Sequence, residues 1–60
     1  MIEHLEESKK QIIHLWIGGL DFPVQHGSFD LADDWCYWTG DNGDYFEAPV
    51  AQIQAIKVWQ

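Results

Sequence analysis

The stretch that decides the fold is residues 34–48, DWCYWTGDNGDYFEA. It contains two aromatic-rich runs, 34–40 and 44–48, on either side of Asp41-Asn42-Gly43. Asn-Gly at the centre of a two-residue loop is the strongest short-range signal of a type I′ β-hairpin. The sequence therefore predicts two antiparallel strands joined by a tight turn. The register of this hairpin would pair Asp41 with Asp44, Thr39 with Phe46, and Trp38 with Glu47.

A second strand-forming run lies upstream, over residues 11–17. It is rich in β-branched and apolar residues and is closed by Gly18-Gly19, which favours a strand. Alternation along this strand would place Ile13, Leu15 and Ile17 on one face and Ile12, His14 and Trp16 on the other. A helix that continues through the run is the alternative, because four apolar residues also fit a helical stripe: Ile2, Leu5, Ile12 and Trp16.

The first residues of the chain favour a short helix. Ile2 and Leu5 lie one helical turn apart, and Lys9-Lys10 come late, where they match the helix dipole. A helix over about residues 2–10 is therefore expected, and it is short enough to fray.

The other segments carry weaker signals. Pro23 and Gly27 punctuate the middle of the chain, so we expect only a short strand over residues 24–29. Residues 30–34 are expected to form a turn or a single helical turn. Pro49 ends the hairpin, and residues 53–59 predict a last strand that is entered through a helical turn.

Together these segments predict an α+β fold. A short N-terminal helix would accompany a three- to four-stranded, mostly antiparallel sheet, with a small SH3-like half-barrel as the main variant in shape. No repeat or linker divides the chain, so residues 1–60 are treated as a single small domain. A chain this short buries about 60% of its unfolded surface, which predicts marginal stability.

Composition excludes several classes of function. The chain has 10 acidic residues, 3 Lys and no Arg, with a formal net charge of −7. Phosphate binding depends on Lys and Arg, so direct binding of DNA or RNA is not expected. No apolar run approaches the roughly 20 residues of a spanning helix, and the N-terminus lacks the features of a signal peptide, so we expect no membrane association. The lone Cys36 indicates a reduced, cytoplasmic protein.

The sequence also offers no convincing catalytic or metal site. The segment Asp41-Asn42-Gly43-Asp44 is superficially similar to a calcium loop, but it lacks the EF-hand ligand positions. The three histidines and Cys36 are too widely spaced for a zinc pattern. Cys36 lies in an aromatic run without a local cation that would lower its pKa, so it is interpreted as structural. We therefore expect no enzyme activity, no metal and no cofactor, although an enzyme or metal protein built on Cys36 and the histidines is a third hypothesis.

Two features do suggest a function. The chain has nine aromatic residues, more than so small a domain can bury, and seven carboxylates between residues 21 and 47 with no cation among them. Trp and Tyr dominate binding hot spots, and an acidic surface associates readily with a basic one. We therefore expect a non-catalytic acidic protein-binding module. In its sharper form it is an inhibitor that mimics nucleic acid, and the chain is similar in size and charge to small phage and mobile-element inhibitors of this kind.

The predicted partner-binding residues are the carboxylates and aromatic anchors of this region: Asp30, Asp33, Asp34, Trp35, Trp38, Asp41, Asp44, Tyr45 and Glu47. The partner would be a basic surface of a nucleic-acid-processing protein. The alternative is a structural or homo-oligomerisation module, such as a homodimer, that buries the same aromatic strands between identical subunits.

Overall fold

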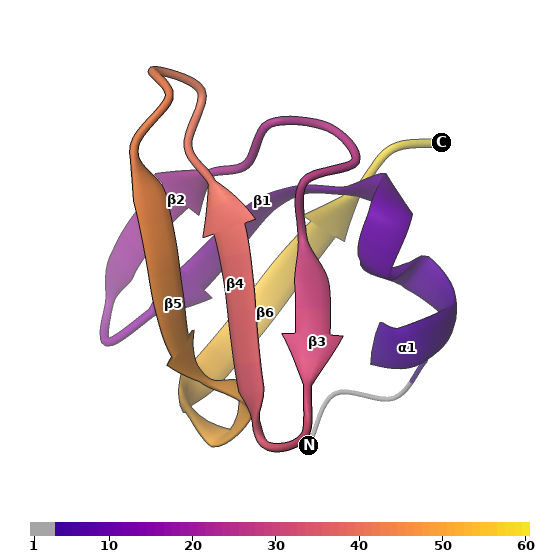
Figure 1. Ribbon diagram of the computed structural model, residues 1–60, viewed down its shortest axis with the longest axis vertical. Helices are drawn as coiled ribbons and strands as arrows, with labels where there is room; N and C mark the ends of the chain where they lie inside the picture. Colours follow the sequence, from indigo (N-terminus) through magenta and orange to yellow (C-terminus); the bar gives the residue numbers. More distant parts are fainter. Residues whose placement is uncertain (1–3) are drawn as a thin grey trace.

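The computed structural model describes residues 4–60, in which six strands form two three-stranded antiparallel sheets (Figure 1). The strand orders are β2-β1-β6 and β3-β4-β5. The strands are β1 (Ile12–Ile17), β2 (Leu20–Pro23), β3 (Asp30–Ala32), β4 (Trp35–Thr39), β5 (Tyr45–Pro49) and β6 (Ile53–Val58). The helical elements are α1 (Leu5–Ser8) and two 3-10 turns, η1 (Lys9–Gln11) and η2 (Val50–Gln52).

The predicted α+β class is confirmed. The structure has one short helix followed by antiparallel strands, but the strands divide into two packed sheets instead of one continuous sheet. This arrangement is closer to the half-barrel variant. After β2 the chain crosses from the first sheet to the second, and there the backbone N–H of Gln25 donates to the carbonyl of Thr39 in β4 at 2.9 Å.

The helix is shorter than expected. Residues 2 and 3 of the predicted helix lie outside the described residues, and α1 gives way to a 3-10 turn before β1 begins. His4 precedes α1 with a left-handed φ of 64°. Leu5 is buried, so the single turn of helix is held by its contact with the core.

Strand β1 is confirmed, but the expected division of its faces is wrong. Ile12 and Leu15 are both fully buried although they are three residues apart. The register with β6 shifts between Ile12 and His14, so β1 carries one extra residue there. Such a β-bulge changes the phase of the alternation, which brings both side chains into the core.

The middle of the chain also differs from the prediction. No strand covers residues 24–29; β2 ends at Pro23 and a loop follows. The Ser28 hydroxyl anchors this loop, because it donates to the Thr39 carbonyl at 3.2 Å and accepts from the Thr39 N–H at 3.1 Å. Val24 and Phe29 are buried although they lie outside any strand. After the loop, β3 replaces the expected turn, and the chain reverses at Asp33, whose φ is 55°.

The β4–β5 hairpin is confirmed, but its predicted register is wrong by one residue. Gly40 pairs with Asp44, with its N–H donating to the Asp44 carbonyl at 2.7 Å, and the Gly43 N–H donates to the Gly40 carbonyl at 3.0 Å. Gly43 has a φ of 94°, whereas Asp41 and Asn42 are not among the residues with positive φ. A type I′ turn needs positive φ at both central residues, so the loop is a three-residue one with glycine in the left-handed position.

The C-terminal prediction is confirmed. A 3-10 turn, η2, enters β6, and β6 pairs antiparallel with β1. The Val50 N–H donates to the Asp34 carbonyl at 2.8 Å, which fixes η2 against the start of β4.

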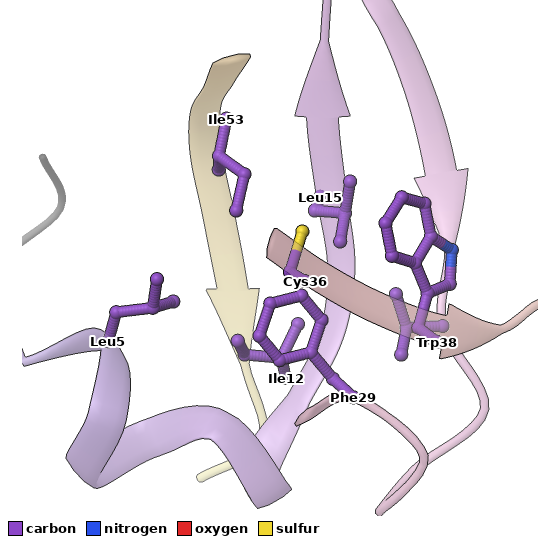
Figure 2. Close-up of a cluster of buried hydrophobic side chains, with 8 residues drawn as sticks. Leu5, Ile12, Leu15, Phe29, Cys36, Trp38 and Ile53 are labelled. Carbon is purple, nitrogen blue, oxygen red and sulfur yellow. The ribbon is translucent and has the colours of Figure 1, made fainter. Parts of the chain in front are cut away.

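The core lies between the two sheets and is closed on one side by α1 (Figures 1 and 2). Its buried members come from both sheets, the helix and the loop after β2: Leu5, Ile12, Leu15, Val24, Phe29, Cys36, Trp38 and Ile53. None of the buried residues among those described is charged.

Candidate functional site

Strand β4 separates its aromatic residues onto two faces. Cys36 and Trp38 point into the core, whereas Trp35 and Tyr37 lie on the outer face of the β3-β4-β5 sheet. Trp35 is 51% exposed and Tyr37 is half-buried. About half of the Trp35 surface therefore stays accessible to water after folding.

Strand β5 contributes to the same face. Tyr45 pairs with Thr39 and is 63% exposed, and Glu47 pairs with Tyr37. The Tyr45 hydroxyl donates to a Glu47 carboxylate oxygen at 2.8 Å, and this hydrogen bond raises the pKa of Tyr45. The rings of Tyr37 and Tyr45 lie 6.4 Å apart.

We call these residues the outer aromatic face, and its members are Trp35, Tyr37, Tyr45 and Glu47. Three of them were predicted as site residues, and Tyr37 was missed. The period-two alternation of a strand was the signal for Tyr37, because it places residue 37 on the same face as Trp35.

Trp38 does not belong to this face, which corrects its prediction as a surface anchor. It is only 2% exposed and stacks between Phe29 and Phe46. Its indole Nε1 has no hydrogen-bond partner among the described residues. The register of β4 explains this position, since Trp38 shares the inward face with Cys36.

Asp30 was expected to lack a counter-charge, and this expectation is wrong. Its carboxylate pairs with Lys9 Nζ and with Lys10 Nζ, each at 3.1 Å. The backbone N–H of Leu31, followed by the two ammonium groups, holds the pKa of Asp30 well below its ordinary value. Asp30 therefore links η1 to β3, and its negative charge is balanced by the two lysines.

The remaining predicted carboxylates lie at the two ends of the sheet. Asp33 and Asp34 form the β3–β4 turn at one end, and Asp41 and Asp44 lie in the β4–β5 loop at the other (Figure 1). All four are exposed, and no ion pair among residues 4–60 involves them. The acidic residues therefore border the outer aromatic face at both ends.

The seven carboxylates counted in the sequence do not share one face. Asp21 belongs to β2 in the other sheet, where its carboxylate lies 3.0 Å from His14 Nε2. Asp30 is paired with two lysines. Five carboxylates without an ion-pair partner among the described residues therefore remain around the β4–β5 hairpin: Asp33, Asp34, Asp41, Asp44 and Glu47.

A shallow hollow opens at one end of the face. It is lined by Asp34, Pro49, Val50 and Ala51. Asp34 precedes Trp35 in the chain, and Pro49 is the cross-strand partner of Trp35, so Trp35 neighbours two of the lining residues although it does not line the hollow itself.

Two features of the described residues bear on catalysis and metal binding, namely the Cys36 thiol and the placement of possible metal ligands. Cys36 is buried as a free thiol; burial raises its pKa, and its Sγ donates to the Ala48 carbonyl at 3.3 Å. Within residues 4–60, no cluster of three His, Cys, Asp or Glu side chains is placed to hold a metal ion. No helix in this part of the chain is long and apolar enough to cross a membrane.

Comparison with protein-family models, with curated proteins and with solved structures finds no match to this chain.

Proposed function

We propose that the protein is a non-catalytic binding module whose outer aromatic face docks on a basic surface of another protein. The observation that carries this proposal is the exposure of Trp35 and Tyr45 on one sheet face bordered by carboxylates. Trp and Tyr are the residues most enriched among interface hot spots. Their rings supply contact area, and the bordering carboxylates select a partner of opposite charge.

The charge distribution supports a basic partner. Lys9 and Lys10 are engaged with Asp30 at the edge of the sheet, and Lys57 lies on β6 in the other sheet. The four acidic residues at the ends of the sheet have no such counter-charge among the described residues. A carboxylate at the rim of an interface accelerates association with a basic surface and suppresses binding to an acidic one.

A narrower form of the proposal is that the protein mimics nucleic acid. Strand β4 has five residues, and at about 3.3 Å per residue it separates the two acidic ends of the sheet by roughly 17 Å. An elongated negative surface of this kind suits a groove that holds a phosphate backbone. In this form the protein would be an inhibitor of a nucleic-acid-processing enzyme, without binding nucleic acid itself. The proposal includes a cytoplasmic location, which the free, buried Cys36 supports because free thiols are typical of a reducing compartment.

The test is affinity capture from a host lysate with the wild-type chain and two variants. The first variant combines Trp35→Ala and Tyr45→Ala, and the matched control is Trp59→Ala. Trp59 is 62% exposed and lies outside the outer aromatic face. We expect the wild type and the control to retain the same basic protein, and the double variant to lose it.

Salt and competing DNA extend the experiment. Raising the salt from about 0.1 M to about 1 M shortens the Debye length from about 10 Å to about 3 Å, so the captured protein should be released. Duplex DNA should displace it if the contact covers a nucleic-acid groove. A partner that resists salt and is retained equally by the double variant would contradict the proposal.

Homodimerisation through the same face is the alternative function. The exposed aromatic rings favour it, whereas the formal net charge of −7 opposes contact between two identical acidic surfaces. Sedimentation velocity separates the two functions. A dimer that the Trp35→Ala and Tyr45→Ala substitutions dissociate would support the alternative.

A further inference from the structure

The hollow beside Trp35 is held in a defined shape. The Val50 N–H donates to the Asp34 carbonyl at 2.8 Å, which ties η2 to the β3–β4 turn. On the other side, Pro49 ends the ladder between β4 and β5 opposite Trp35. The lining residues therefore come from two segments that the backbone fixes relative to each other, so the hollow does not depend on a mobile loop.

We infer that this hollow receives an arginine side chain of the basic partner. The inference rests on the proposed function and names the group that the partner inserts. A guanidinium ion is planar, so it can stack on the exposed Trp35 indole while its N–H groups donate to the Asp34 carboxylate. Pro49, Val50 and Ala51 would cover the aliphatic stem of the arginine.

Charge at the hollow argues for a cationic occupant. Asp34 is exposed, and no ion pair among residues 4–60 involves it. An apolar side chain in the hollow would remove water from this carboxylate without replacing the lost hydrogen bonds. An arginine restores those hydrogen bonds, so the same carboxylate that penalises an apolar occupant stabilises a cationic one.

Lysine is the closest competitor and differs in a measurable way. Its ammonium group is a compact, strongly hydrated charge, whereas the guanidinium is weakly hydrated and matches a carboxylate and an aromatic plane together. General electrostatic attraction between the acidic protein and a cationic peptide would give arginine and lysine peptides the same affinity. A preference for arginine therefore distinguishes the hollow from the surrounding electrostatic field.

The test uses two blocked peptides of equal length, an oligo-arginine and an oligo-lysine, titrated into the full chain at fixed salt. Affinity is followed by isothermal titration calorimetry and by the NMR shift of the Trp35 indole N–H. We expect the oligo-arginine to bind about tenfold more tightly, in the range of a desolvated cation–π contact. Trp35→Leu and Asp34→Asn should each abolish most of this preference.

Matched variants separate the hollow from its surroundings. Trp59→Leu removes another exposed indole, and Asp41→Asn removes one charge from the far end of the same sheet. Both should keep the arginine preference, although Asp41→Asn should weaken both peptides equally. All four positions are exposed, and a dispersed NMR spectrum verifies that each variant is folded.

Three results would overturn the inference. Equal binding of the two peptides, or equal loss with Asp34→Asn and Asp41→Asn, would leave a general acidic surface, and the proposed function would stand without the arginine site. Absence of binding by either peptide would overturn the inference, and the capture experiment would then decide the proposed function independently.

Discussion

Trp38 and Phe46 face each other across the β4–β5 ladder, and their rings stack with centroids 5.5 Å apart at an interplanar angle of 16°. Phe22 of β2 meets both rings edge-on, at 5.8 Å from Trp38 and 5.6 Å from Phe46. This aromatic cluster therefore joins the two sheets. Trp35, three residues earlier on the same strand, is 51% exposed on the outer face of the sheet.

Truncation of Trp38 should destabilise the protein far more than truncation of Trp35. Trp38→Ala is expected to lower the free energy of unfolding by about 3–5 kcal/mol, because it leaves a cavity between the sheets. Trp35→Ala should cost less than about 1 kcal/mol, because half of its surface is already exposed. Urea denaturation followed by circular dichroism measures both.

The loss with Trp38→Ala is comparable to the whole stability of a small domain, so Trp38→Phe provides a second measurement. It keeps an aromatic ring in the stack and removes an indole N–H that has no partner among the described residues. We expect a smaller loss than with alanine. If Trp38 and Trp35 proved equally tolerant of alanine, the assignment of the two faces of β4 would be wrong.

The loop geometry predicts a specific cost at Gly43. Its φ of 94° is unfavourable for a residue with a Cβ, so Gly43→Ala should destabilise the protein by about 1–2 kcal/mol. Asp41→Ala in the same loop is the control, and it should change stability by less than about 0.5 kcal/mol. Comparable losses at the two positions would contradict the three-residue loop.

The contact between η1 and β3 should weaken in acid. The pKa of Asp30 is lowered in the folded protein, so its contribution is complete above the ordinary value of 3.8 and is lost as the pH falls below that value. Lys9, whose pKa is raised by Glu6 and then by Asp30, loses its contribution only above its ordinary value of 10.5. NMR shifts of the η1 and β3 amides during a pH titration report this contact.

The Asp30→Asn variant isolates the acid effect. At neutral pH it should be less stable than the wild type, and the two stabilities should converge in acid, where Asp30 is protonated. Asp41→Asn is the control, because no ion pair among residues 4–60 involves Asp41. A stability difference for Asp30→Asn that is independent of pH would contradict the role of the carboxylate.

Cys36 should be protected from thiol reagents in the folded protein. It is fully buried, and burial raises the pKa of its thiol, so the reactive thiolate is scarce. A thiol-reactive aromatic disulfide should therefore modify the native protein at least about tenfold more slowly than the urea-unfolded chain. Equal rates at the same pH would show that Cys36 is accessible.

The strands could be predicted where local chemistry decides them. The β-branched run before Gly18-Gly19 predicts β1, and the aromatic runs around Asp41-Asn42-Gly43 predict β4 and β5. The class of fold follows from these segments. The type of loop could not be predicted, because Asn-Gly occurs in both two-residue and three-residue hairpin loops. This difference of one residue shifts the register, so every residue of the β4–β5 ladder has a different cross-strand partner from the one predicted.

Long-range contacts account for most of the remaining differences between the predicted and the observed structure. The bulge at the start of β1 depends on its pairing with β6, and the burial of Phe29 depends on Trp38 in another element. The ion pairs of Asp30 need two lysines that lie twenty and twenty-one residues earlier in the sequence. In the candidate site, the alternation of a strand places Trp35 and Trp38 on opposite faces of β4. Both residues are tryptophan, so the residue type does not indicate which of the two faces is buried.

The pairing of β1 with β6 also sets the order in which the fold can be completed. β1–β2, β3–β4 and β4–β5 are local hairpins that can form early, but the first sheet needs its third strand from the far end of the described chain. Such distant pairing requires loop closure before any contact is gained, so folding on the order of milliseconds to seconds is expected. A nascent chain still lacking β6 would hold the β1–β2 hairpin and the complete β3-β4-β5 sheet, without Ile53 to close the core between them.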